Sequence, residues 1–228
     1  MSRFGAFLRS NSLSLCFLIL FVGCLLGQAV AGWHQFNTQQ VVDGLGVVSF
    51  GRYLLSADFA VDVSENWQSE YLQFLTYLMA TVWLIQKGSP ESKKPEEAGR
   101  ESQEEQNIGE HATEDSPAWA RFSNGLRLRI YSSSLLIVMS VIFFASWLVQ
   151  SISGQASFNG ERLRNLQDPI SWTGYIKNAD FWSRTLQNWQ SEFLAVGSMA
   201  VLSIYLRQRG SSQSKPVGQP HTSTGVDG

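Results

Sequence analysis

The chain has 228 residues, of which 44% are hydrophobic and only 16% are charged. The charged fraction lies below the roughly 25% that is usual for soluble domains, and the apolar residues gather in separate runs. A net charge of -2 at pH 7 does not supply the basic surface that a nucleic-acid-binding protein needs. We therefore expect no nucleic-acid partner.

The first hydrophobic run, residues 13–31, reads LSLCFLILFVGCLLGQAVA and carries no charged side chain. A helix of about 20 apolar residues crosses the hydrocarbon core of a bilayer, so we predict a transmembrane span here. Arg3, Arg9 and the A-x-A pattern at 29–31 also fit a cleavable secretory signal. We expect the span to be retained, because its apolar run is longer than that of a usual signal. A similar run occurs in mid-chain, at residues 135–152, where it cannot be a signal peptide, and this also favours a retained span.

A second hydrophobic run, residues 71–85, is marginal as a span by itself. It becomes long enough if its helix starts after Asp58 as N-cap, so we predict a helix from about 59 to 86 with a span at about 68–86. The preceding loop contains FGRYLLSA (50–57), whose apolar side chains fall on one face of a short helix. We interpret this segment as an interfacial helix on the outer membrane surface.

An acidic linker follows the first pair of spans. Between residues 88 and 120 the chain holds nine acidic and three basic residues, and almost no aliphatic ones. Such a segment cannot bury enough apolar surface to offset the entropy cost of ordering, so we expect residues 95–125 to be disordered. The tail at 210–228 is also polar, and we expect it to be flexible.

The second half of the chain repeats the first. When residues 12–93 are aligned with the chain 122 residues later, 25 of 82 positions are identical without a gap. The pentapeptide NWQSE, for example, occurs at 66–70 and again at 188–192. We infer an internal duplication. The second copy has predicted spans at about 133–152 and 190–208, and its last helix is predicted from about 181 to 208 with Asp180 as N-cap. Its outer loop contains WTGYIKNA, which we interpret as a second interfacial helix.

These elements predict an all-α fold in which four transmembrane helices form two tandem helical hairpins. The predicted domains are a first membrane hairpin repeat (1–94), the acidic cytoplasmic linker (95–125), a second hairpin repeat (126–209) and the tail (210–228). Two spans per copy return the chain to its starting side, so both copies have the same orientation. Twelve Lys and Arg residues lie on the side of the termini and linker, and five lie in the outer loops. This distribution predicts that both termini are cytoplasmic.

The repeated pentapeptide supplies a candidate polar site. On a helix its Asn, Ser and Glu share one face. The two copies therefore offer matching patches: Asn66, Ser69 and Glu70, and Asn188, Ser191 and Glu192. If both patches face the axis between the repeats, the glutamates approach each other, and a shared proton or a bound cation becomes chemically reasonable. The alternative, which we favour, is that these groups form hydrogen bonds between helices or hold the loop on the bundle.

Aromatic rings flank these patches at helical i, i+4 spacing. Such rings concentrate at the headgroup level of a membrane. We interpret Trp67 and Tyr71 in the first copy, and Trp189 and Phe193 in the second, as interface anchors.

Catalytic and metal-binding motifs are missing from the sequence. It has no P-loop, G-x-S-x-G, H-E-x-x-H or dinucleotide fingerprint. The three histidines, His34, His111 and His221, have no partner at metal-binding spacing. We expect no metal site, no cofactor and no enzymatic activity.

Several segments together resemble a known family. They are LRSNSLSL near the start, GQAVAGWHQFN, ENWQSEYLQ, QKGSPESK, and the long block from NWQSEFLAVGSMAVLSIYLRQRG to the end. The chain resembles an uncharacterised bacterial family of small integral membrane proteins, the domain of unknown function numbered 6766. The resemblance implies a bacterial inner-membrane protein and supplies no activity or catalytic residue.

Two functional hypotheses remain. The first is a non-enzymatic membrane protein with an assembly, envelope or partner-binding role, whose partners are the lipid bilayer and a second copy or another membrane protein. The second is a small ion- or proton-coupled transporter or channel that uses Glu70 and Glu192.

Overall fold

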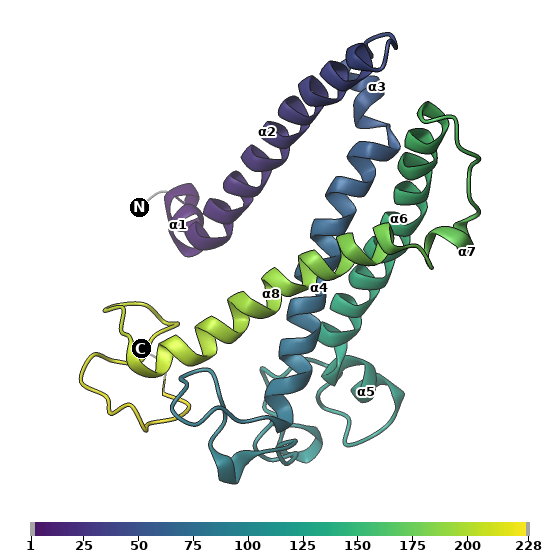
Figure 1. Cartoon of the computed structure of the whole chain (residues 1–228). Coiled ribbons are helices and arrows are strands. Elements are labelled where there is room, and N and C mark those ends of the chain that lie inside the picture. The colour runs from purple at the N-terminus through teal and green to yellow at the C-terminus, as the bar shows by residue number, and fades with distance from the viewer. Residues whose placement is uncertain (1–2, 227–228) are drawn as a thin grey trace. The chain divides into compact units, whose positions relative to one another are not determined.

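The computed structural model describes residues 3–226, and this part of the chain is all-helical, with no β-strand. The first two residues of the predicted first repeat and the last two of the predicted tail lie outside the described residues. The α-helices, in chain order (Figure 1), are α1 (Arg3–Ser10), α2 (Ser12–Val42), α3 (Phe50–Leu54), α4 (Ala57–Trp83), α5 (Leu126–Ser132), α6 (Ser134–Arg164), α7 (Trp172–Tyr175) and α8 (Ala179–Tyr205). Two short 3-10 helices, η1 (Pro95–Glu97) and η2 (Gly109–His111), lie in the predicted linker.

The long helices come in pairs of equal length. Helices α2 and α6 each have 31 residues, and α4 and α8 each have 27. Within each pair the first residues are 122 positions apart, which is the shift that aligns the two halves of the sequence.

Helices α2 and α6 are long and apolar enough to cross a membrane. Their most apolar 18-residue windows have mean hydropathies of 2.4 and 2.2, and only 6% and 22% of those windows are buried. The other two long helices do not meet the same composition test. The 18-residue windows that end these helices, 66–83 and 188–205, begin with the polar NWQSE segment, which lowers their mean hydropathy.

The helix boundaries correct several predictions. Helix α2 continues to Val42, and α6 to Arg164, well beyond the apolar runs that predicted them. Asp180 lies in the first turn of α8 and is not its N-cap. Asn178 caps the helix, because its side chain accepts a hydrogen bond from the backbone N–H of Asp180.

Helix α4 also begins before its predicted N-cap. It begins at Ala57, so Asp58 also lies in a first turn. The hydroxyl of Ser56 accepts from the backbone N–H of Phe59, at 3.2 Å, and satisfies one of the free donors of this helix end. The Asp58 carboxylate instead accepts from the hydroxyl of Ser157, at 2.8 Å.

The chain forms two compact units, and each contains parts of both predicted repeats. One unit comprises Met1–Val63 and Val149–Gly174, and the other comprises Ser64–Leu148 and Tyr175–Gly228. The contacts described below lie within one unit or the other.

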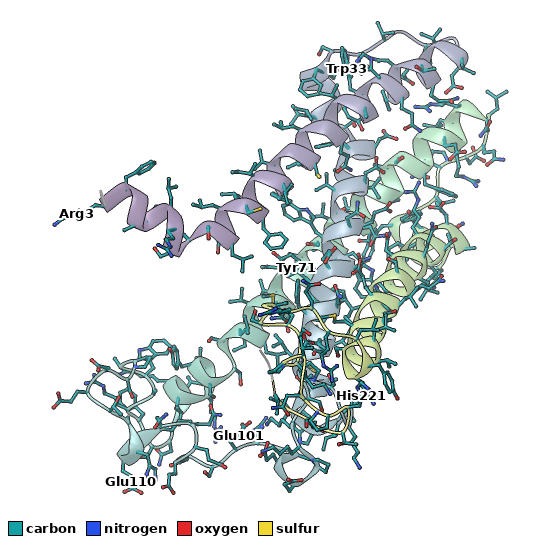
Figure 2. The ribbon with its side chains drawn as sticks, turned by 90° about the vertical axis from the view of Figure 1, so that its left-hand side faces the viewer. Arg3, Trp33, Tyr71, Glu101, Glu110 and His221 are labelled. Atoms are coloured by element: carbon teal, nitrogen blue, oxygen red, sulfur yellow. The ribbon has the colours of Figure 1, made fainter. Side chains whose placement is uncertain are left out.

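In the first unit, one asparagine in each repeat clamps the loop that follows its long helix. The side chain of Asn37 accepts from the backbone N–H of Val48, at 2.7 Å, and donates to its carbonyl, at 3.0 Å. Asn159 makes the same two bonds to Ile170, both at 2.9 Å. Trp33, labelled on α2 in Figure 2, adds a bond from its ring N–H to the Val48 carbonyl. These clamps hold the loops at 43–49 and 165–171 against the ends of α2 and α6.

In the second unit, a common turn follows α4 and α8. Gly88 and Gly210 adopt positive φ values of 89° and 83°, which favour glycine. Four residues after each glycine, a serine hydroxyl accepts a backbone N–H: Ser92 from Gln86 and Ser214 from Gln208, both at 2.9 Å. The conserved spacing explains why the sequence Gln-x-Gly-Ser-x-x-Ser-Lys occurs in both copies.

The lysines that end this turn have different surroundings. Lys93 is partly exposed, donates to the Gly99 carbonyl and pairs with Glu101. Lys215 is only 1% exposed, and four backbone carbonyls share the three N–H donors of its ammonium group: those of Gly88, Pro220, His221 and Ser223. The buried ammonium therefore ties the C-terminal segment, on which His221 is labelled in Figure 2, to the turn after α4.

Candidate functional site

The two NWQSE segments lie on α4 and α8 and meet within the second unit. Ser69 is 1% exposed, and its hydroxyl donates to Oε1 of Glu192 over 3.4 Å. The same hydroxyl lies 2.9 Å from the carbonyl oxygen of Asn66, one turn earlier on α4. The structure thus brings together one predicted site residue from each copy.

The closest contact between the pentapeptides uses two residues outside the predicted patches. The ring N–H of Trp189 donates to Oε1 of Gln68 over 2.7 Å. Gln68 is fully buried, and its amide nitrogen has no hydrogen-bond partner among the described residues. Sequence reasoning missed Gln68 because helical geometry turns it away from the Asn, Ser and Glu face. The sequence signal that could have identified Gln68 is that glutamine occupies this position in both NWQSE segments.

The remaining members of the patches are more peripheral. Asn66, Glu70 and Ser191 are exposed, and Asn188 is partly buried. The Ser191 hydroxyl donates to the Asn188 carbonyl on its own helix, at 2.8 Å. The equivalent pair in the other direction would be Ser191 with Glu70. Among the described residues no hydrogen bond joins these two, so the contact between Ser69 and Glu192 is not symmetric.

The four predicted anchors also differ in their surroundings. Trp67 and Phe193 are 41% and 45% exposed, which suits a ring that faces lipid, and Tyr71 is partly buried. Trp189 packs inside the second unit, with its ring centroid 6.0 Å from that of Trp147. Anchoring at an interface stays a prediction for all four.

Trp147 is the centre of an aromatic cluster. Its ring stacks on Phe143 and Phe181, with centroids 5.7 and 6.1 Å apart, and meets Trp182 edge-on. Aromatic pairs at these distances stabilise a packed core beyond the area that they bury. The cluster positions Trp189 and, through it, the amide of Gln68.

An ion-pair network lies at the start of α8. The guanidinium of Arg184 is 3.3 Å from a carboxylate oxygen of Glu65 and 3.6 Å from one of Asp180. Burial acts to lower the pKa of Arg184, but these two carboxylates outweigh it and raise the pKa overall. Burial also raises the pKa of Tyr175, and the adjacent Asp180, which accepts from its hydroxyl at 3.1 Å, raises it further. This network joins α8 to α4, and its residues form no recognisable motif in the sequence.

The described part of the chain contains no cluster of side chains that could bind a metal ion. No group of three or more His, Cys, Asp or Glu side chains comes close enough there to hold an ion.

The family model for a domain of unknown function (DUF6766) matches residues 4–226, which is nearly the whole chain. The chain belongs to this family. No curated protein and no solved structure matches it. The family assignment agrees with the resemblance drawn from the sequence and assigns no activity to any residue.

Proposed function

We propose that this member of the family is a multi-pass protein of the bacterial inner membrane. Its four long helices, α2, α4, α6 and α8, would cross the bilayer as two tandem hairpins of the same orientation. The observation that carries the proposal is the exposure of α2. Phe17, Leu18, Ile19 and Leu20 are each more than half exposed, in a window of which only 6% is buried. Apolar surface of this extent requires a non-aqueous surrounding.

The shorter apolar stretches support the other two crossings. Helices α4 and α8 have 27 residues each, and at 1.5 Å per residue each is roughly 40 Å long, more than the roughly 30 Å of a hydrocarbon core. Residues 71–86 and 193–206 contain no charged side chain. Their charged first turns would lie in the headgroup region, where ionised groups cost far less than at the bilayer centre.

Repeated local geometry supports the duplication. The asparagine clamps at Asn37 and Asn159 and the serine turns at Ser92 and Ser214 are each 122 residues apart. A copied hairpin with two crossings returns the chain to the same side. The excess of Lys and Arg on the side of the termini and linker makes that side cytoplasmic.

The role that we propose is non-enzymatic, in assembly or partner binding within the envelope. The polar groups of the pentapeptides are used for contacts between α4 and α8, through Gln68 with Trp189 and Ser69 with Glu192. The exposed apolar surface of α2 is available to lipid and to a second copy or another membrane protein.

Native mass spectrometry of the intact protein in mild detergent tests this role. A retained second copy or a stoichiometric membrane-protein partner is the expected result. A monomer in every mild detergent, with no partner after cross-linking in intact membranes, would refute it.

A second candidate is a proton- or cation-coupled transporter, which the approach of Ser69 to Glu192 favours. Replacing both Glu70 and Glu192 with glutamine would remove the titrating groups and keep the side-chain shape. Under this reading, pH- or cation-dependent flux in liposomes disappears while thermal stability persists. If wild-type liposomes show no such flux, or the double variant retains it, the transporter reading is wrong.

A further inference from the structure

A cavity of about 210 Å³ lies at the C-terminal end of α4. The last turns of α4, the turn that follows it and Ala200 of α8 form its walls, all within the second unit. Its lining mixes apolar side chains such as Leu84 and Ile85 with polar ones such as Tyr77 and Glu91. The volume is below the roughly 300–1,000 Å³ of drug-sized ligand sites, so the cavity admits only a small group.

The cavity is negative and lacks a cation of its own. The hydroxyl of Tyr77 donates to Oε2 of Glu91 over 2.5 Å. Within residues 3–226 no Lys, Arg or His lies within ion-pair distance of Glu91, and the nearby Lys93 and Lys94 pair with Glu101 and Glu97. In the described part of the chain no basic side chain lines the cavity, and Lys87, which follows the lining residue Gln86, is exposed. The carbonyl end of a helix, however, favours a positive charge.

The second copy carries such a cation within its own sequence. At the end of α8, Nη1 of the Arg207 guanidinium lies 3.3, 3.0 and 2.8 Å from the carbonyl oxygens of Ser203, Ile204 and Leu206, which share its two N–H donors. The residue 122 positions before Arg207 is Ile85, an apolar side chain that lines the cavity.

The residues around this position differ between the copies in a consistent direction. Glu91 and Tyr77 of the first copy correspond to Gln213 and Met199 of the second. The copy with an internal guanidinium therefore lacks the carboxylate, and the copy with the carboxylate lacks the guanidinium.

We propose that the cavity at the end of α4 binds an organic cation, a primary ammonium or guanidinium group on a short apolar body. Glu91, held by Tyr77, supplies the counter-charge, the end of α4 supplies carbonyl dipoles, and Leu84 and Ile85 contact the apolar part. The group takes the place that Arg207 fills at the end of α8. Its source is an aminophospholipid headgroup or a soluble amine. Only the lipid source depends on the proposed membrane location.

The test uses the full chain in detergent and in phosphatidylcholine nanodiscs. Butylammonium is titrated while tryptophan fluorescence and melting temperature are followed, and nanodiscs that contain phosphatidylethanolamine are examined for retained lipid by native mass spectrometry. The variants are Glu91→Gln, which removes the counter-charge, and Ile85→Arg, which installs the cation of the second copy. Glu97→Gln, at an exposed carboxylate outside the cavity, is the matched control.

We expect Glu91→Gln to weaken binding at least tenfold and Ile85→Arg to abolish it without lowering the melting temperature. The control should stay within twofold of the wild type. Retention of phosphatidylethanolamine without butylammonium binding identifies a lipid headgroup as the ligand. Binding of butylammonium without retention of phosphatidylethanolamine identifies a soluble amine. The proposal is overturned if the wild type binds neither butylammonium nor phosphatidylethanolamine, or if both cavity variants bind like the wild type. It is also overturned if potassium binds as tightly as butylammonium and loses as much affinity in Glu91→Gln.

Discussion

The buried lysine of the C-terminal segment offers a sharp test of the contacts in the second unit. Replacing Lys215 with methionine keeps the length and much of the volume of the side chain and removes the ammonium group. Four backbone carbonyls then lose their donor, at distances of 2.5 to 3.4 Å from the ammonium nitrogen. We expect the C-terminal segment to detach from the turn after α4 while the helices remain folded.

The magnitude follows from the bonds that are lost. A hydrogen bond to a charged group contributes about 1.5–3 kcal/mol. The ammonium group has three N–H donors, and the gain from three such bonds is partly offset by the several kcal/mol needed to desolvate an ammonium ion. A net loss of about 2–4 kcal/mol corresponds to a roughly 30- to 900-fold fall in protection of the segment from hydrogen exchange.

Hydrogen exchange with mass spectrometry measures this change. Peptides that cover residues 216–226 and 86–92 should lose protection in Lys215→Met. Lys93→Met is the matched control, because Lys93 occupies the equivalent position but is partly exposed and pairs with Glu101. It should affect exchange only near residues 94–101. Unchanged protection of the C-terminal segment in Lys215→Met, or an equal loss in Lys93→Met, would refute the reasoning.

Three further predictions concern other contacts. Asn159→Ala should cost about 1–3 kcal/mol of unfolding free energy, because the N–H and carbonyl of Ile170 lose their partner; the exposed Asn165→Ala should cost less than about 0.5 kcal/mol, and equal melting temperatures would contradict this. Trp189→Phe should cost a similar 1–3 kcal/mol by leaving Oε1 of the buried Gln68 without a donor, in contrast to Trp119→Phe in the linker; equal denaturation midpoints would be inconsistent with that contact. The raised pKa of Tyr175 adds stability that is fully present below the unfolded tyrosine pKa of about 10 and is lost as the pH rises through the higher folded value; an absorbance titration at alkaline pH should therefore lose a late-ionising tyrosine in Tyr175→Phe, and loss of a tyrosine that ionises near pH 10 would count against the burial argument.

The helical class and the approximate positions of the long helices follow from the sequence, because apolar runs of span length have few other stable forms. The internal shift of 122 residues also anticipated the equal lengths of α2 and α6 and of α4 and α8. The N-caps were wrong because aspartate, asparagine and serine are all good caps and a local pattern does not rank them. The continuation of α2 to Val42 was missed because polar residues after an apolar run carry little signal for where a helix ends.

The details of the site depended on contacts that sequence spacing does not specify. Ser69 and Glu192 were both candidates, but the sequence did not predict their contact, because it depends on how α4 and α8 are rotated toward each other. Gln68 was not a candidate, since its hydrogen-bond partner, Trp189, lies 121 residues away in the sequence. The cavity beside Ile85 has no signature in the sequence, because its lining comes from α4, from the turn after it and from Ala200 of α8.

The central claim, two hairpins that cross the membrane in the same orientation, is tested most directly by cysteine accessibility. Single cysteines at residues 49, 171, 102 and 211 would replace serines, with Cys16 and Cys24 changed to serine, and a membrane-impermeant maleimide would be added to intact cells and to inverted vesicles. The account predicts that positions 49 and 171 react only in intact cells and that 102 and 211 react only in inverted vesicles. Labelling of position 102 from outside the cell, or of 49 and 171 from opposite sides, would contradict it.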